Sequence, residues 1–180
     1  MPRLFAAVDL PPDWKSAFSA AVAGVAGCGG RPTPPENLHV TVFFLGETEQ
    51  RLVPELIGGL AASVSLLAPF CLAFSRLRPQ ADRMLWAAFA DSPDWRRLCG
   101  AVRLAAAPFA AKPASREQTA HVTLARFKRG GASLAAPVSF TPPEPSLAVT
   151  AVELVRSELA PRGPAYFREH RFELAGGHTA

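Results

Sequence analysis

The amino-acid sequence predicts an α+β fold that contains a repeated unit. The first observation is the repeat itself, because His39-Val40-Thr41-Val42 returns as His121-Val122-Thr123-Leu124, 82 residues further along the chain. The second is the expected order of elements: strand, helix, motif strand, helix, two strands, helix, motif strand, two strands. This order fits an α+β duplication better than a doubly wound parallel sheet. The third is that neither a G-x-G-x-x-G turn nor a G-x-x-x-x-G-K-[ST] loop occurs, which disfavours a P-loop or dinucleotide fold.

The length and composition favour one compact unit. With 180 residues and 49% hydrophobic composition, the chain can bury one sizeable core, so we expect a single bilobal domain over residues 1–180, with a flexible tail at 175–180. We find no apolar run of membrane-spanning length and no cleavable leader, so we expect no membrane partner. Three widely spaced cysteines fit thiols in a reducing compartment. We therefore expect a cytoplasmic monomer.

In the first half, hydrophobic periodicity and breaker residues predict two strands and two helices. Residues 4–10 read as a strand, and Pro11-Pro12-Asp13 opens a helix to about Val25 before the glycines at 27–30. The proline-rich segment 31–37 leads into the first motif strand, which ends near Gly46. A second helix is expected over 53–67, with its proline in the first turn, where proline is tolerated.

In the second half, alternating residues predict strands at 70–77 and 84–90, followed by a helix over 93–107 that begins at a Pro-Asp pair. The second motif strand comes next, and two strands, 147–159 and 165–174, close the chain. We expect Trp86 to be buried in the sheet, with base stacking as the alternative. Tyr166 or Phe167 could face a ligand.

The repeated motif places the same chemistry on one strand face twice. Strand alternation puts His and Thr on one face and Val with Val or Leu on the other. A neutral imidazole can take a proton while a protonated one gives a proton, and the threonine hydroxyls can donate to an anionic oxygen between them. Hydrogen-bonded structural histidines are the alternative. Zinc fits less well, because no third His, Cys or carboxylate lies at ligand spacing. We expect neither a metal nor a cofactor.

The net charge of +4 and the dominance of Arg among the 19 basic residues weakly favour an anionic partner. The arginines are scattered, so no basic stripe of the kind expected for a large nucleic-acid footprint is visible.

Three segments resemble one family. They are Arg3-Leu4-Phe5-Ala6-Ala7-Val8-Asp9-Leu10-Pro11, then Pro34-Pro35-Glu36-Asn37-Leu38-His39-Val40-Thr41 with Leu45-Gly46, then His121-Val122-Thr123-Leu124-Ala125-Arg126. They are similar to the bacterial and archaeal RNA 2′,3′-cyclic phosphodiesterases of the 2H (two-histidine) phosphoesterase superfamily, also called 2′-5′ RNA ligase-like proteins. The resemblance extends to about Leu174. Two departures are Phe43, where such proteins often carry Lys, and Thr119-Ala120, where a Pro is common before the second histidine.

This resemblance implies a bilobal 2H fold with two antiparallel-rich sheets flanking a central groove, helices outside, and His39 facing His121. It implies RNA processing by metal-independent hydrolysis of a terminal 2′,3′-cyclic phosphate on RNA or a nucleotide, which leaves a 2′-phosphate. His39 and His121 would be catalytic, and Thr41, Thr123 and Arg126 would bind the phosphate. We expect His121 to be the base and His39 the acid, although the near-symmetric pair also allows the reverse.

One residue conflicts with simple alternation. Arg126 lies five positions after His121, which would place it on the face opposite the histidine, so a bulge or strand end must redirect it. At the same offset the first copy has Phe44, so the two halves should differ. Two other functions stay open: a 2′-5′ RNA ligase activity by the reverse chemistry, and a nucleotide- or RNA-binding protein without turnover.

Overall fold

The computed structural model describes residues 1–81, 83–110, 119–128, 140–161 and 163–177, so 178–180 of the expected tail lie outside the described residues. The strands are β1 (Arg3–Asp9), β2 (Gly30–Pro32), β3 (His39–Glu47), β4 (Phe70–Gln80), β5 (Met84–Phe89), β6 (His121–Phe127), β7 (Ser146–Val149), β8 (Ala151–Ala160) and β9 (Gly163–Glu173). The α-helices are α1 (Pro12–Ala21), α2 (Val53–Val64) and α3 (Pro93–Ala106). The fold is α+β, as the sequence predicts.

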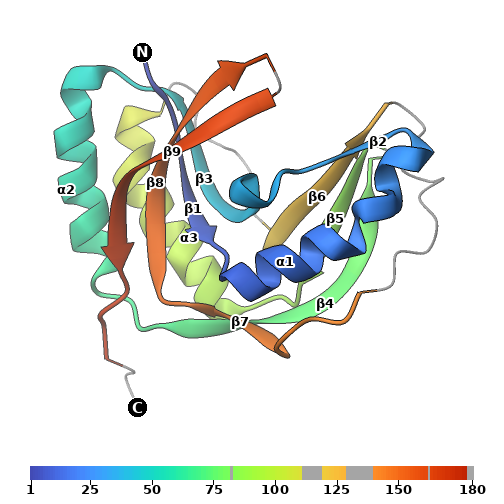
Figure 1. The fold of residues 1–180 in the computed structure, drawn as a ribbon. Helices are drawn as coiled ribbons and strands as arrows, with labels where there is room; N and C mark the ends of the chain where they lie inside the picture. The colour runs from blue at the N-terminus through green and yellow to red at the C-terminus, as the bar shows by residue number, and fades with distance from the viewer. Residues whose placement is uncertain (82, 111–118, 129–139, 162, 178–180) are drawn as a thin grey trace.

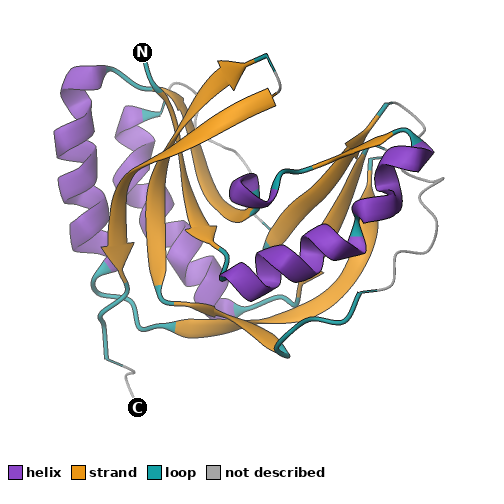
Figure 2. Ribbon diagram, viewed as in Figure 1, coloured by secondary structure: helices purple, strands orange, loops and turns teal. Residues whose placement is uncertain are grey.

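The strands form one antiparallel sheet with two arms. Its order is β7-β4-β5-β6-β3-β1-β8-β9, and β2 pairs with β6 outside this path. Figures 1 and 2 show the arm of β3, β1, β8 and β9 diverging from the arm of β6, β5 and β4. The arms are joined where β3 meets β6, through the single residue pair Val40 and Val122. The two sheets that we expected are therefore one sheet, connected at the motif strands.

The helices lie on the outer faces of the arms (Figure 2). α2 and α3 pack against each other beside β3 and β9. α1 covers the other arm, where Trp14 lies 5.9 Å from Phe89 between ring centroids. Buried side chains recur every three or four residues in each helix, as burial of one helical face requires. A continuous core of buried apolar residues runs through both arms.

Several boundaries differ from the sequence-based expectation. α1 ends at Ala21, and a 3₁₀-helix over Ala23–Cys28 follows it, while α2 ends at Val64. The expected strand 147–159 is two strands, because β7 pairs with β4 in one arm whereas β8 pairs with β1 in the other. The three-residue strand β2 was not expected, since Pro32 is one of its residues and proline removes a ladder donor.

Two further observations concern membrane-spanning helices and the cysteine thiols. No helix in the described ranges has the length and apolar character that a membrane span requires. Cys28 and Cys71 are exposed thiols, and Cys99 packs against the core.

Candidate active site

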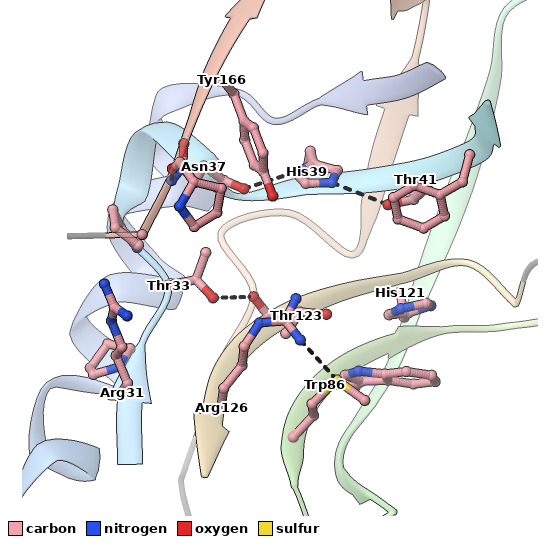
Figure 3. A pocket seen from close by; sticks show the side chains of 16 residues that line it. Arg31, Thr33, Asn37, His39, Thr41, Trp86, His121, Thr123, Arg126 and Tyr166 are labelled. Atoms are coloured by element: carbon pink, nitrogen blue, oxygen red, sulfur yellow. Dashed lines mark hydrogen bonds between the residues drawn. The ribbon is translucent and has the colours of Figure 1, made fainter. Parts of the chain in front are cut away.

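A groove of about 430 Å³ lies between the two arms, and the motif strands β3 and β6 form its floor. Figure 3 shows His39 and Thr41 on one side and His121, Thr123 and Arg126 on the other. The lining residues are Arg31, Pro32, Thr33, Pro34, Asn37, His39, Thr41, Phe44, Met84, Trp86, His121, Thr123, Arg126, Gly163, Pro164 and Tyr166. All five residues that the sequence analysis selected for the site therefore line one groove.

The pairing of Val40 with Val122 explains why the two motifs face the same groove. Each valine follows its histidine directly, and the two strands are antiparallel. A local twofold axis between antiparallel partners places equivalent neighbours on opposite sides of the pair. Both valines are fully buried, so the histidines, one position away on each strand, point to the groove face.

Each imidazole is held by a backbone carbonyl two residues before it. Nδ1 of His39 donates to the Asn37 oxygen at 2.7 Å, and Nδ1 of His121 donates to the Thr119 oxygen at 2.7 Å. A carbonyl only accepts, so Nδ1 carries the proton in both rings, and in the neutral ring Nε2 keeps its lone pair. In His39, Nε2 accepts from the Thr41 hydroxyl at 3.1 Å. The two rings are thus held in the same tautomer.

Burial lowers the pKa of both histidines. It lowers the pKa of His39 from 6.5 to about 4, although the carbonyl of Asn37 and the carboxylate of Asp9 act in the opposite direction. Burial also lowers the pKa of His121; the Thr119 carbonyl opposes this, and the positive charges of Arg78 and Arg126 add to it. Both imidazoles are therefore neutral at neutral pH when the groove holds no anion.

A β-bulge redirects Arg126 into the groove. Leu85 pairs with Ala125 and the next residue, Trp86, pairs with Thr123, so Leu124 is the extra residue of β6. The bulge restores Arg126 to the face of Thr123, as the sequence analysis required. There Nη1 of Arg126 donates to Sδ of Met84 at 3.3 Å.

The first motif strand has the same bulge at the same offset. Ala6 pairs with Phe43 and Ala7 pairs with Thr41, so Val42 is the extra residue of β3. Phe44 therefore reaches the groove at the position equivalent to that of Arg126, and half of its surface is exposed. The two halves present an aromatic ring and a guanidinium at equivalent points.

We expected Trp86 to be buried in the sheet, but the structure places it at the groove. Its indole is partly exposed at the groove wall, and it stacks on His121 with 3.6 Å between ring centroids. The prediction failed because alternation places Met84 and Trp86 on one face of β5 without telling which face that is, and the pairing of Trp86 with Thr123 makes it the groove face.

Sequence reasoning missed several groove residues that precede the first motif or come from β9. The Thr33 hydroxyl donates to the Thr123 carbonyl at 2.7 Å, and Asn37 Nδ2 donates to the Pro164 carbonyl at 2.8 Å. Arg31 lines the groove from β2. The proline-rich composition of 31–37 and the family resemblance over 34–37 marked this segment, but neither gave a sign of the pairing with β6. Of the two β9 candidates, Tyr166 lines the groove, whereas Phe167 lies under the guanidinium of Arg156.

Comparison with known proteins identifies the family of this chain. The profile described as the 2′-5′ RNA ligase superfamily matches residues 11–161. The chain belongs to the 2′-5′ RNA ligase superfamily.

Similar proteins match this chain over nearly their whole length. A Thermus thermophilus protein named RNA 2′,3′-cyclic phosphodiesterase is 33% identical over 98% of this chain and 92% of its own length. An Archaeoglobus fulgidus protein of the same name is 28% identical, over 91% of this chain and 96% of its own length. The crystal structure of E. coli LigT complexed with NADP⁺ is 26% identical, with a TM-score of 0.81, and covers 97% of this chain and 99% of that chain. E. coli LigT complexed with 3′-AMP has a TM-score of 0.79, with the same identity and coverage.

The departure at Phe43 from the superfamily pattern does not change the groove surface. Phe43 is 2% exposed and belongs to the core, because the bulge at Val42 turns both Val42 and Phe43 to the buried face.

As for metal ligands, the described parts of the chain contain no group of three His, Cys, Asp or Glu side chains placed to hold an ion.

Proposed function

We propose that this chain is an RNA 2′,3′-cyclic phosphodiesterase that hydrolyses a terminal 2′,3′-cyclic phosphate to a 2′-phosphate. The observation that carries the proposal is the pairing of Val40 with Val122, which sets two imidazoles and two threonine hydroxyls around one groove. An acid and a base on opposite sides of one groove suit in-line displacement at phosphorus. The names of the Thermus and Archaeoglobus relatives support the same activity.

In the proposed reaction, His121 is the base. Its Nε2 takes a proton from water while the water oxygen forms a bond to phosphorus. The bond from phosphorus to the 3′-oxygen breaks, and His39 gives its proton to that oxygen, leaving a 3′-hydroxyl and a 2′-phosphate. His121 then carries the proton taken from water and His39 lacks the proton given to the 3′-oxygen, so exchange with solvent restores both groups.

The surrounding charges favour His39 as the acid and His121 as the base. Asp9 lies directly opposite His39 in the β1–β3 pair, and its carboxylate favours a protonated imidazole. The guanidinium of Arg126 lowers the pKa of both rings, and Arg78 lowers that of His121 further, which favours the neutral ring that a base requires. Burial keeps both rings neutral before substrate binds. The negative charge of the bound phosphate raises the pKa of each ring, so His39 gains its proton when substrate is present.

Thr41, Thr123 and Arg126 stabilise the charge that builds on the non-bridging oxygens as phosphorus becomes five-coordinate. The two hydroxyls reach the site from opposite motif strands, and the bulge at Leu124 brings the guanidinium to the same face. Donors already held at this position need little rearrangement during the reaction. These groups supply positive charge and hydrogen bonds, so the proposed mechanism uses no metal ion and no cofactor.

The proposed partners are RNA ends and nucleotides that carry a 2′,3′-cyclic phosphate, as expected for RNA processing. E. coli LigT is complexed with 3′-AMP and with NADP⁺ in its crystal structures, and NADP⁺ bears a 2′-phosphate of the kind that this reaction would produce. We also propose that the chain acts in the cytoplasm as a monomer, with residues 1–180 as one bilobal unit, since both halves contribute to the groove.

A second candidate function is 2′-5′ RNA ligation, which the name of the superfamily favours. In that reaction a 5′-hydroxyl of RNA replaces water as the attacking group, and the same two histidines serve as base and acid. Formation of a 2′-5′-linked product from cyclic-phosphate RNA without ATP would support it.

The test is to incubate the purified protein, in excess EDTA, with adenosine 2′,3′-cyclic phosphate and with a cyclic-phosphate-ended RNA. We expect a 2′-phosphate product, separated from the 3′-isomer by ion exchange. His39→Ala and His121→Ala should lose activity, while the control His170→Ala should keep it, because His170 is exposed on β9 and lies beside Phe172 outside the groove. Tight nucleotide binding without turnover of either substrate would instead identify a binding protein.

A further inference from the structure

Arg31 and Arg126 form a pair of like charges inside the groove. Arg31 on β2 lies directly opposite Arg126 on β6 in an antiparallel register, and both line the groove. Like charges directly opposite each other on a sheet repel and destabilise the pair. This pairing is therefore unfavourable in the empty groove, and an anion between the guanidiniums would relieve it.

Nothing in the described protein neutralises the two charges. Among the described residues, neither Arg31 nor Arg126 has a carboxylate within ion-pairing distance, whereas Arg51 and Arg97 on the outer surface each do. No acidic side chain is among the groove residues. Both guanidiniums are thus available to an anionic ligand.

The Arg31 guanidinium lies against the backbone at the start of β9. A Cβ atom on Gly163 would lie only 2.7 Å from Nη2 of Arg31. Gly163 also has a backbone φ of +125°, a conformation that residues other than glycine rarely adopt. The adjacent Pro164 carbonyl accepts from Asn37 Nδ2 at 2.8 Å, which ties β9 to the segment before His39. The backbone of β9 therefore forms a wall beside the guanidinium.

The arginine pair and the histidine pair occupy successive positions along β6. β3 pairs with β6 at Val122, whereas β2 pairs with β6 at 125–127, beside the same strand. In Figure 3, Arg126 lies between Arg31 and the imidazole of His121. Arg126 can therefore contact an anion held between the histidines, while Arg31 lies one step further from the reaction centre.

We propose that Arg31, together with Arg126, forms a second phosphate subsite, which takes the phosphate on the 5′ side of the nucleotide whose cyclic phosphate lies between the histidines. This inference rests on the proposed function. Within one nucleotide the ribose and its 5′ carbon separate the two phosphates, so a second anionic group must lie along the groove from the first. A guanidinium binds phosphate through two parallel hydrogen bonds. The preferred substrates are then RNA ends and 5′-phosphorylated cyclic nucleotides, rather than 5′-hydroxyl mononucleotides.

The kinetic test compares adenosine 2′,3′-cyclic phosphate with the same nucleotide carrying a 5′-phosphate. We expect the wild-type protein to have the higher kcat/KM for the 5′-phosphorylated substrate. In Arg31→Ala the ratio of the two kcat/KM values should fall by about 10- to 100-fold, as loss of a charged hydrogen bond implies, mainly through KM. In the control Arg103→Ala the ratio should stay unchanged, because Arg103 is exposed on α3 outside the groove.

Two results would overturn the inference. One is an equal loss of kcat/KM for both substrates in Arg31→Ala, which would assign Arg31 to the cyclic phosphate. The other is no preference for the 5′-phosphate in the wild-type protein.

Calorimetric binding of adenosine 2′,5′-bisphosphate and adenosine 2′-phosphate separates this inference from the proposed reaction. Tighter binding of the bisphosphate that disappears in Arg31→Ala, without turnover of any cyclic substrate, would reject the proposed function and keep the subsite. Turnover without any preference in binding or kinetics would reject the subsite alone.

Discussion

The indole of Trp86 lies flat against the imidazole of His121, with ring planes 18° apart and 3.6 Å between centroids. The guanidinium of Arg78 lies 5.4 Å from the centroid of the same indole. Trp86 therefore covers one face of the proposed base, excludes water from it and restricts rotation of its ring. Its Nε1 has no hydrogen-bond partner among the described residues, so no side-chain hydrogen bond fixes the indole in place.

The first prediction concerns this stack. Trp86→Ala should lower kcat by about 10-fold, because the imidazole loses its orientation, and should raise the pKa of His121 towards 6.5 by rehydrating it. The acidic limb of the pH–rate profile then moves to higher pH. Trp86→Phe, which keeps an aromatic face and removes an unpartnered N–H, should retain most of the activity and the stability. An Ala variant with a wild-type pH profile would contradict the shielding role.

The second prediction concerns the two catalytic candidates. His39→Ala and His121→Ala should each lower kcat by at least ~100-fold, the usual contribution of a positioned acid or base. Circular dichroism should show that both variants remain folded, since neither imidazole belongs to the core. Near-normal turnover in both folded variants would end the two-histidine mechanism.

The third prediction concerns pH and rate. The reaction requires one proton on the histidine pair, so kcat/KM should give a bell. In the free protein the pKa of His39 is about 4 and the pKa of His121 also lies below 6.5, so the optimum of kcat/KM should be acidic. The optimum of kcat should lie at higher pH, because the bound phosphate raises both values. A rate that climbs steadily to high pH would contradict the acid role.

The same variants test which histidine has which role. On our assignment, His121→Ala flattens the acidic limb of the residual activity and His39→Ala flattens the alkaline limb, provided that chemistry limits the rate. The opposite pattern would reverse the assignment and keep the pair.

The fourth prediction concerns pH and stability. His39 has a pKa of about 4 in the folded protein and 6.5 in the unfolded chain, so below pH 6.5 the unfolded chain binds the extra proton. The free energy of unfolding should therefore fall between about pH 7.5 and about pH 5, with up to about 2 kcal/mol of the loss due to His39. Urea unfolding of the wild type and His39→Gln at both pH values measures this part. An equal loss in the variant would show that His39 is not its source.

The fifth prediction concerns metal ions. Activity should persist in excess EDTA, because a protonated imidazole, two hydroxyls and the Arg126 guanidinium provide the charge stabilisation that a metal ion would otherwise supply. The assay compares initial rates before and after chelation. Loss of activity that a divalent ion restores would contradict the proposed mechanism.

Local sequence determined a large part of this protein. The alternation of His and Thr with apolar residues determined which side chains share a face in each motif strand, and the repeat marked the two strands that carry the site residues. Helical periodicity located α1, α2 and α3, although two of their ends were wrong by a few residues. These features depend on neighbours within one strand or one turn, so the sequence contains them directly.

The tertiary structure decided the rest of the groove. The bulges at Val42 and Leu124 bring Phe44 and Arg126 to the groove face, and pairing with β6 brings Arg31 opposite Arg126. The break between β7 and β8 arises because the chain changes from one partner strand to another. Bulges and strand partners are set by hydrogen bonds to segments far apart in the chain, and local periodicity carries no record of them.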